Sequence, residues 1–228
     1  MELLRVENVF KSYYLNKQEI QAVKGISFSI EAGDIIVIVG SSGSGKSTLL
    51  TLLGGLLKPS RGKVLYKQQS LYTLSNGRLS IIRNQVFGFV FQFHYLISEL
   101  TARENVMLPA RIARKKINET VKRAEELLEQ VGMKDRMNHK PGELSGGEQQ
   151  RVAVCRALMN QPEVIFADEP TGNLDIKTAE GVHDVLWNLC QKTGTSLVVV
   201  THYEPLTQRA DHVLTLNEGM VIKKRSLN

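Results

Sequence analysis

Residues 34–48 read DIIVIVGSSGSGKST, and this stretch decides the fold class. Residues 34–39 form an unbroken, mostly β-branched run, which is typical of a strand buried on both faces of a parallel sheet. A glycine-rich loop follows, and then an apolar stretch from Lys46 to about Leu57 that predicts a helix ending near Lys58 and Pro59. Because a strand, a glycine loop and a helix in this order form a phosphate-binding loop, the sequence predicts an α/β fold of the P-loop NTPase class.

The loop carries each group that a nucleoside triphosphate requires. Gly43 and Gly45 free the backbone N–H groups to converge on phosphate oxygens. Lys46 is expected between the β- and γ-phosphates, the Ser47 hydroxyl on Mg²⁺, and Thr48 as a further phosphate contact. A glycine turn that merely joins strand to helix is disfavoured, because every consensus position is filled. The nucleotide site is therefore predicted to comprise Gly40, Ser41, Ser42, Gly43, Ser44, Gly45, Lys46, Ser47 and Thr48.

The remaining chain alternates between sheet-like and helical patterns. Residues 3–9 and 26–30 are short β-rich stretches between polar turns, which predict an antiparallel layer. Residues 101–161 are helical in pattern, and parallel strands are predicted at 164–167 and 196–200 with a helix over about 177–190 between them. We expect one domain over residues 1–228, in which an α/β core carries an antiparallel β subdomain and a helical insertion at roughly 93–161.

Composition limits the classes of function. The chain has 228 residues, 42% of them hydrophobic and 23% charged, which is ordinary for a soluble globular protein. The net charge of +6 fits an acidic partner, either nucleic acid, an anionic membrane face or nucleotide phosphates, or simply a basic solvated surface. Its two cysteines, Cys155 and Cys190, are too few for a disulfide framework or a four-ligand zinc site and are expected in the core.

Membrane segments are not expected. The N-terminus lacks the basic start and apolar run of a signal peptide, and no apolar stretch approaches the roughly 18 residues that span a bilayer. If the protein works at a membrane, it is expected to do so from the cytoplasmic side, through partners only.

Two carboxylates end a predicted buried strand. Asp168 and Glu169 follow residues 164–167, and ligands of open parallel sheets bind at this carboxyl edge. Asp168 is expected to hold Mg²⁺ through water. Glu169 stands one residue further out and is expected to polarise the attacking water as general base. The alternative, two surface carboxylates in a loop, is weak because paired acids at a strand end repel each other.

His202 and Gln92 also stand at strand ends. His202 follows the strand at 196–200, so it reaches the same carboxyl edge as the acidic pair. A lone histidine is more often structural, but this placement favours a role in the site. Gln92 follows a β-rich stretch at 86–91, where the helical insertion begins, and is placed to touch Mg²⁺ or the attacking water.

A second glycine motif begins another helix. Ser145, Gly146, Gly147 and Glu148 satisfy a capping box, so an ordinary helix start explains the serine and the glutamate. Two glycines in a helix cost roughly 1 kcal/mol each relative to alanine. They favour a site where a ligand approaches the helix N-terminus closely, and a γ-phosphate from a second subunit suits that positively polarised end.

Taken together, these motifs resemble the ATP-binding subunits of ABC transporters. The match covers essentially the whole chain in the family's order and comprises residues 40–48, Gln92, 144–150, 164–169, 173–175 and His202. The resemblance implies a P-loop NTPase (RecA-like) core, ATP and Mg²⁺ as ligands, and ATP hydrolysis coupled to transport. It also implies a head-to-tail homodimer, in which each ATP lies between the phosphate loop of one subunit and Ser145, Gly146 and Gly147 of the other.

The family assigns further roles to single residues. By this resemblance Tyr13 stacks on adenine, although its neighbour Tyr14 is an alternative. Asp175 lies at the dimer seam, His202 contacts the γ-phosphate, and Gln92 couples the site to integral membrane subunits. Tyr203 departs from the family, where an aspartate commonly follows the histidine, and this puts the local hydrogen bonding there in doubt.

A narrower resemblance rests on residues 41–44, 53–56, 91–96 and 171–175. These segments are similar to the lipoprotein-releasing branch of the family, which works with LolC- and LolE-like membrane subunits at the cytoplasmic face of the bacterial inner membrane. MacB-like exporters and FtsE-like cell-division regulators share most of the same features and stay as alternatives. DNA-handling relatives carry long coiled coils and translation factors carry two such domains, so neither fits this chain and no nucleic-acid partner is expected.

Overall fold

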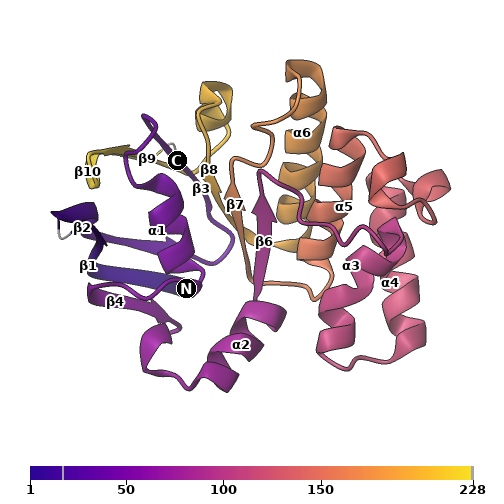
Figure 1. Cartoon of the computed structure of the whole chain (residues 1–228), viewed down its shortest axis with the longest axis horizontal. Coiled ribbons are helices and arrows are strands. Elements are labelled where there is room, and N and C mark those ends of the chain that lie inside the picture. The colour runs from indigo at the N-terminus through magenta and orange to yellow at the C-terminus, as the bar shows by residue number, and fades with distance from the viewer. Residues whose placement is uncertain (17, 227–228) are drawn as a thin grey trace. The chain divides into compact units, whose positions relative to one another are not determined.

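The structure is a computed structural model that describes residues 1–16 and 18–226 (Figure 1). The chain divides into two compact units, Met1–Ser80 with Ser196–Asn228, and Ile81–Thr195. Its strands are β1 (Glu2–Leu15), β2 (Gln18–Glu31), β3 (Ile35–Gly40), β4 (Arg61–Tyr66), β5 (Gln69–Ser70), β6 (Phe87–Phe91), β7 (Val164–Asp168), β8 (Ser196–Val200), β9 (His212–Asn217) and β10 (Met220–Ser226). Its helices are α1 (Lys46–Leu53), α2 (Asn76–Gln85), α3 (Ala102–Ile112), α4 (Ile117–Gln130), α5 (Gly146–Leu158) and α6 (Ile176–Thr193).

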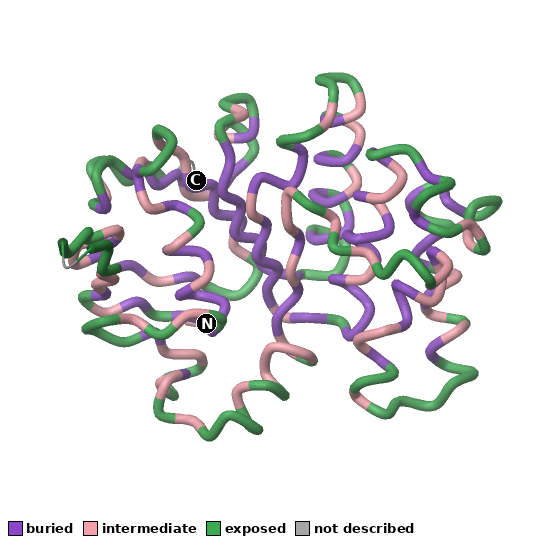
Figure 2. Tube along the Cα trace, in the orientation of Figure 1, coloured by how far each residue is buried: buried purple, intermediate pink, exposed green. Residues whose placement is uncertain are grey.

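The first unit contains the predicted antiparallel layer, in the order β2-β1-β4-β5. β1 and β2 are each 14 residues long, far longer than the two β-rich stretches predicted, because their polar residues pair as regularly as their apolar ones. In the same unit β3 runs parallel to both β8 and β9, and β10 is antiparallel to β9. All side chains of β8 and most of those of β3 are buried (Figure 2), which explains why both sequences are continuous apolar runs.

In the second unit β6 and β7 are parallel, with Phe87 opposite Val164 and Phe91 opposite Asp168. The predicted helical stretch at 101–161 contains α3, α4 and α5, and α3 packs against both others. The capping box of Thr101 and Glu104 begins α3 as predicted. Gly132, at φ +72°, follows the last residues of α4, also as predicted. The chain therefore has the α/β fold of P-loop NTPases, and its division into one domain with an insertion at 93–161 stays a prediction.

The predicted end of α1 is also wrong. α1 ends at Leu53, four residues before the expected end at Leu57. Gly54 caps it and Gly55 adopts φ +68°, a left-handed conformation that ends a helix readily at glycine. The apolar Leu56 and Leu57 predict a longer helix, but the glycine pair that precedes them ends it.

Both cysteines lie in helices of the second unit and are buried, as predicted. Burial raises the pKa of Cys190 to about 12, so this thiol stays protonated and inert. Among the described residues, no helix combines the length and the apolar character that a membrane span requires.

Candidate nucleotide-binding and catalytic residues

The phosphate loop joins β3 to α1 within the first unit. Gly43 and Gly45 adopt φ +77° and +98°, so the loop uses the backbone conformations that glycine allows. A Cβ on Gly45 would lie 2.1 Å from the carbonyl oxygen of Ala22 in β2. The Ser44 carbonyl accepts a hydrogen bond of 3.0 Å from the backbone N–H of Gly219, in the turn between β9 and β10. Strands distant in sequence therefore hold the loop in shape.

Lys46 lies inside this loop. Only 7% of the residue is exposed, and its ammonium donates to the carbonyl oxygens of Gly40 at 2.9 Å and Ser41 at 3.0 Å. α1 has no side-chain cap and no acidic residue in its first turn, so its N-terminal N–H groups are open to an anion. The buried Ser44 Oγ has no hydrogen-bond partner among the described residues. A cation and an orphaned hydroxyl around a helix N-terminus fit a polyphosphate.

Ser47 is exposed and Thr48 is half-buried, both in the first turn of α1. The described residues contain no cluster of three histidine, cysteine or acidic side chains that would hold a metal by itself. Mg²⁺ keeps few protein ligands where phosphates supply the others. A hydroxyl beside the phosphate loop therefore fits this ion without a larger ligand set.

Tyr13 and Tyr14 lie near the end of β1, and both are exposed. The Lys11 ammonium lies 5.5 Å from the centroid of the Tyr13 ring. Lys11 and Tyr13 share one face of the strand, whereas Tyr14 faces the other. The strand thus separates the two tyrosines, and Tyr13 is the one that shares its face with a cation.

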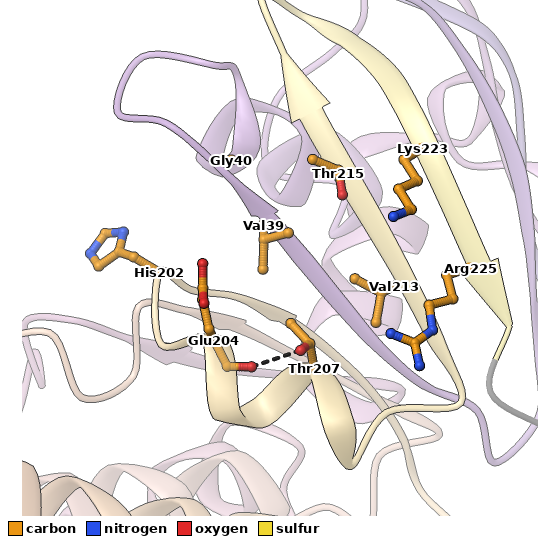
Figure 3. Close-up of a pocket in the computed structure, with 9 residues that line it drawn as sticks. All are labelled: Val39, Gly40, His202, Glu204, Thr207, Val213, Thr215, Lys223 and Arg225. Atoms are coloured by element: carbon orange, nitrogen blue, oxygen red, sulfur yellow. Dashed lines mark hydrogen bonds between the residues drawn. The ribbon is translucent and has the colours of Figure 1, made fainter.

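His202 follows β8 and is exposed. It lines a cavity of about 400 Å³ together with Gly40 at the start of the phosphate loop (Figure 3). The sequence does not predict the charged residues of this cavity, which are Glu204, Lys223 and Arg225. No local pattern in the sequence identifies them: Lys223 and Arg225 lie on β10, which pairs with β9 beside β3, and Glu204 lies in a short helical turn after His202.

Asp168 and Glu169 belong to the second unit, where Asp168 is the last residue of β7. Glu169 is 8% exposed and adopts φ +44°. A left-handed conformation costs a residue with a side chain about 1 kcal/mol, and such strain concentrates at functional sites. A turn holds the backbone of Glu169 in this conformation, because its carbonyl accepts a hydrogen bond from the Gly172 N–H at 3.0 Å.

The structure brings Gln92 against the loop that follows Glu169. The Gln92 side-chain amide donates to Asn173 Oδ1 at 2.9 Å, and a Cβ on Gly172 would lie 3.0 Å from Gln92 Nε2. The residues that follow Gln92 are tied to α5. Arg156 donates to the carbonyl oxygens of His94 and Tyr95, both at 2.6 Å, and these bonds fix the course of the loop.

Ser145 is the N-cap of α5, and the predicted capping box is present. The Ser145 side chain accepts from the Glu148 N–H at 3.3 Å, and Glu148 Oε2 accepts from the Ser145 N–H at 2.8 Å. Gly147 also has a structural reason within the chain. A Cβ there would lie 2.3 Å from Thr178 Cγ2 on α6, so close packing of the two helices favours glycine at this position.

Asp175 is the N-cap of α6 and accepts from the Thr178 N–H at 3.1 Å. Hydrogen bonds from the Thr178 side chain and backbone lower the pKa of Asp175. This capping role explains the residue locally, and its predicted place at a dimer seam stays a prediction. The phosphate loop, Tyr13 and His202 lie in the first unit, and the other predicted groups lie in the second.

A groove of about 290 Å³ lies in the second unit beside the loop that follows Gln92. Its lining includes Phe87, Phe89, Phe91, Tyr95, Pro109 and Arg156. Tyr95 is 66% exposed, and the nearby Phe93 is 62% exposed. We call this feature the aromatic groove.

Comparison with known proteins gives consistent results. The ABC transporter family model matches residues 23–172. The lipoprotein-releasing system ATP-binding protein LolD of Idiomarina loihiensis is 46% identical, with 98% of each chain covered. LolD of Myxococcus xanthus is 47% identical, with 97% of this chain and 99% of the relative covered. Among solved structures, the dimeric ATP-binding cassette MJ0796 bound to ADP and Pi is 39% identical, with a TM-score of 0.91 over 99% of each chain.

Proposed function

The chain belongs to the ABC transporter family and is an ATPase, and we propose that it powers the release of lipoproteins from the bacterial inner membrane. The observation that carries this proposal is the 46–47% identity to LolD proteins over nearly the full length of both chains. The cargo itself is recognised elsewhere, by membrane subunits. Their identity decides between this function and that of a related exporter or division regulator.

For ATP binding, the structure supports the use of the phosphate loop. The Lys46 ammonium donates to the Gly40 and Ser41 carbonyls in this structure. When ATP binds, it would donate to the β- and γ-phosphate oxygens instead, because these are stronger acceptors. Ser47 would hold Mg²⁺ directly and Asp168 through water. When bound, this ion neutralises charge that develops on the phosphates. Tyr13 would stack on the adenine.

For hydrolysis, we assign Glu169 as the general base and His202 as the contact to the γ-phosphate. The strained backbone at Glu169 supports this assignment, because the turn that closes on Gly172 fixes the carboxylate instead of leaving it in a mobile loop. Gln92 lies against the same turn through Asn173. It is therefore placed to sense the state of that turn and report it to the groove.

The active form would be a head-to-tail homodimer. The open N-terminus of α5, with Ser145 and Gly146 exposed, is suited to the γ-phosphate of an ATP held by a second copy. Glu148 stays in the capping box, and Asp175 would lie at the seam. Similar solved cassettes are described as dimeric.

The aromatic groove is the proposed docking site of the integral membrane subunits, which would be LolC- and LolE-like. Exposed Phe93 and Tyr95 offer an apolar surface beside Gln92. Docking there would place the chain at the cytoplasmic face of the inner membrane.

Reconstitution with the co-purifying membrane subunits tests the proposal. Proteoliposomes that contain the complex and a lipoprotein should release the lipoprotein on addition of ATP. Lys46→Ala should abolish release, and Glu169→Gln should bind ATP but accumulate a closed dimer that size-exclusion chromatography detects. Co-purification of an exporter permease or of division proteins, without lipoprotein release, would refute the proposed cargo.

A further inference from the structure

The connection between α3 and α4 is a concentrated patch of positive charge. Residues 111–118 read RIARKKIN and contain no acidic residue, and Arg111, Arg114, Lys115 and Lys116 are all exposed. Figure 1 shows this connection at the tip of the α3–α4 pair, and it is exposed almost throughout in Figure 2. We call residues 111–117 the basic tip.

Two isoleucines accompany the charges. Ile112 is 70% exposed and Ile117 is 55% exposed, so neither contributes to the packing of the helical pair. Cations interleaved with exposed apolar side chains are the composition that binds the boundary between lipid headgroups and acyl chains. A purely solvated tip would gain nothing from the isoleucines.

Arg114 occupies a position that favours glycine. α3 ends in a Schellman motif, in which the Lys115 N–H donates to the Ala110 carbonyl and the Arg114 N–H to the Arg111 carbonyl, both at 3.0 Å. Arg114 is the left-handed residue of this motif, with φ +57°. Glycine is the usual residue there, because a Cβ is unfavourable at positive φ.

Lys116 occupies a second such position. It is the N-cap of α4 and makes no side-chain capping bond. Its ammonium lies 3.5 Å from a Glu119 carboxylate oxygen, but an ion pair this exposed contributes little to stability. Serine, threonine, aspartate and asparagine are preferred at this position, and a cation is unfavourable at the positive end of the helix dipole. At both sites the chain keeps a cation where the local fold favours another residue, and such conflicts mark functional positions.

We infer that the basic tip binds the surface of an anionic phospholipid bilayer directly. This would add a lipid contact to the association through partner subunits that the sequence predicts. The inference rests on the proposed function for its orientation only: Pro109, two residues before Arg111, lines the aromatic groove, so a membrane subunit docked there would hold the tip toward the same membrane.

Flotation of the isolated chain with lipid vesicles tests this inference. Vesicles of phosphatidylcholine with about one-third phosphatidylglycerol should bind the chain, and pure phosphatidylcholine vesicles should not. Each cation at such a surface is worth about fivefold in binding, so Arg114→Gly with Lys116→Ser should weaken binding about 25-fold. Because both substitutions satisfy local preferences, the Tm of this double variant should equal or exceed that of the wild type.

Matched variants separate charge from position. Lys63→Gln with Lys224→Gln removes the same charge from two exposed positions on β4 and β10 and should leave binding within twofold. Ile112→Ser with Ile117→Ser should weaken binding without changing its salt dependence. The inference is overturned if the wild-type chain does not bind anionic vesicles, or if it binds neutral and anionic vesicles equally.

Three further results would also overturn it. The double variant of Arg114 and Lys116 could bind vesicles as the wild type does, or unfold at a lower temperature, which would assign the cations to the fold. It could instead lose binding to single-stranded DNA while keeping vesicle binding, which would assign the tip to nucleic acid. The vesicle assay contains no membrane subunit, ATP or lipoprotein, so its outcome is independent of the proposed function.

Discussion

Gly147→Ala separates two explanations for the glycine pair at the start of α5. The new Cβ would lie 2.3 Å from Thr178 Cγ2, more than 1 Å inside an ordinary van der Waals contact. If packing against α6 is what requires this glycine, the variant loses stability even without nucleotide. If only a phosphate requires it, the nucleotide-free protein tolerates the change.

The magnitude follows from how the overlap can be relieved. Thr178 can rotate about χ1, but its hydroxyl then leaves Asp175, at a cost of about 1 kcal/mol for a lost hydrogen bond. Displacement of α5 from α6 instead costs about 1–3 kcal/mol, as overpacking does. Replacing a glycine in a helix returns at most about 1 kcal/mol. We therefore expect a net loss of about 1 kcal/mol, or a Tm about 2–4 °C lower for a chain of this length.

Thr178→Ser supplies the matched test. It removes Cγ2 and keeps the hydroxyl that bonds Asp175, and the next nearest Thr178 atom, Cβ, is 3.8 Å from the new group. Thermal unfolding of the wild type, both single variants and the double variant completes a double-mutant cycle. The double variant should regain most of the lost stability. The packing explanation would be refuted if Gly147→Ala cost the same stability with serine as with threonine at 178, or if it cost none. ATPase activity that stays low in a stable double variant would support a second role for Gly147 at the phosphate.

Three other perturbations test the site. Gly45→Ala should abolish ATP binding in titration calorimetry, because its Cβ would meet the Ala22 carbonyl oxygen at 2.1 Å and φ +98° disfavours alanine; wild-type affinity would contradict this. Lys46→Ala should end turnover and also destabilise the nucleotide-free protein, by about 1–3 kcal/mol in urea unfolding, since two charged hydrogen bonds are lost; unchanged stability would show that these bonds contribute nothing. Burial and the Arg156 charge lower the pKa of His94, so the folded state binds fewer protons than the unfolded state as the pH falls through the ordinary value of 6.5. The free energy of unfolding therefore declines as the pH falls. His94→Gln should lose less stability than the wild type between pH 7.5 and 5.5, and equal losses would exclude the effect.

Local signals made much of the architecture predictable from sequence. Residues 34–48 combine a strand, three glycines and Lys46-Ser47, and each of these features depends only on near neighbours. The capping boxes at Thr101 and Ser145 are equally local and are both present. The strand that ends at Asp168 is recognisable because both of its faces are buried.

Other features depend on contacts that no local pattern encodes. The close contact that disfavours a side chain at Gly147 comes from Thr178, 31 residues away and on another helix. The cation-lined cavity beside Gly40 depends on β10, whose exposed and mixed sequence is not distinctive. The left-handed backbone of Glu169 has no signal in sequence, since glutamate is not a residue expected there.

Within the second unit, α5 connects the aromatic groove to Gln92 and to Ser145, the two residues there that are proposed to respond to ATP. Near its start, Gln150 donates to the Phe91 carbonyl at 3.2 Å, next to Gln92. About two turns later, Arg156 donates to the Tyr95 carbonyl and so holds the loop that follows Gln92, beside the aromatic groove. Because a helix with buried neighbours moves as one body, displacement of the groove loop by a membrane subunit would shift Ser145 at the other end of α5. Closure of ATP on Ser145 would in turn displace the loop, so the proposed coupling would work in both directions.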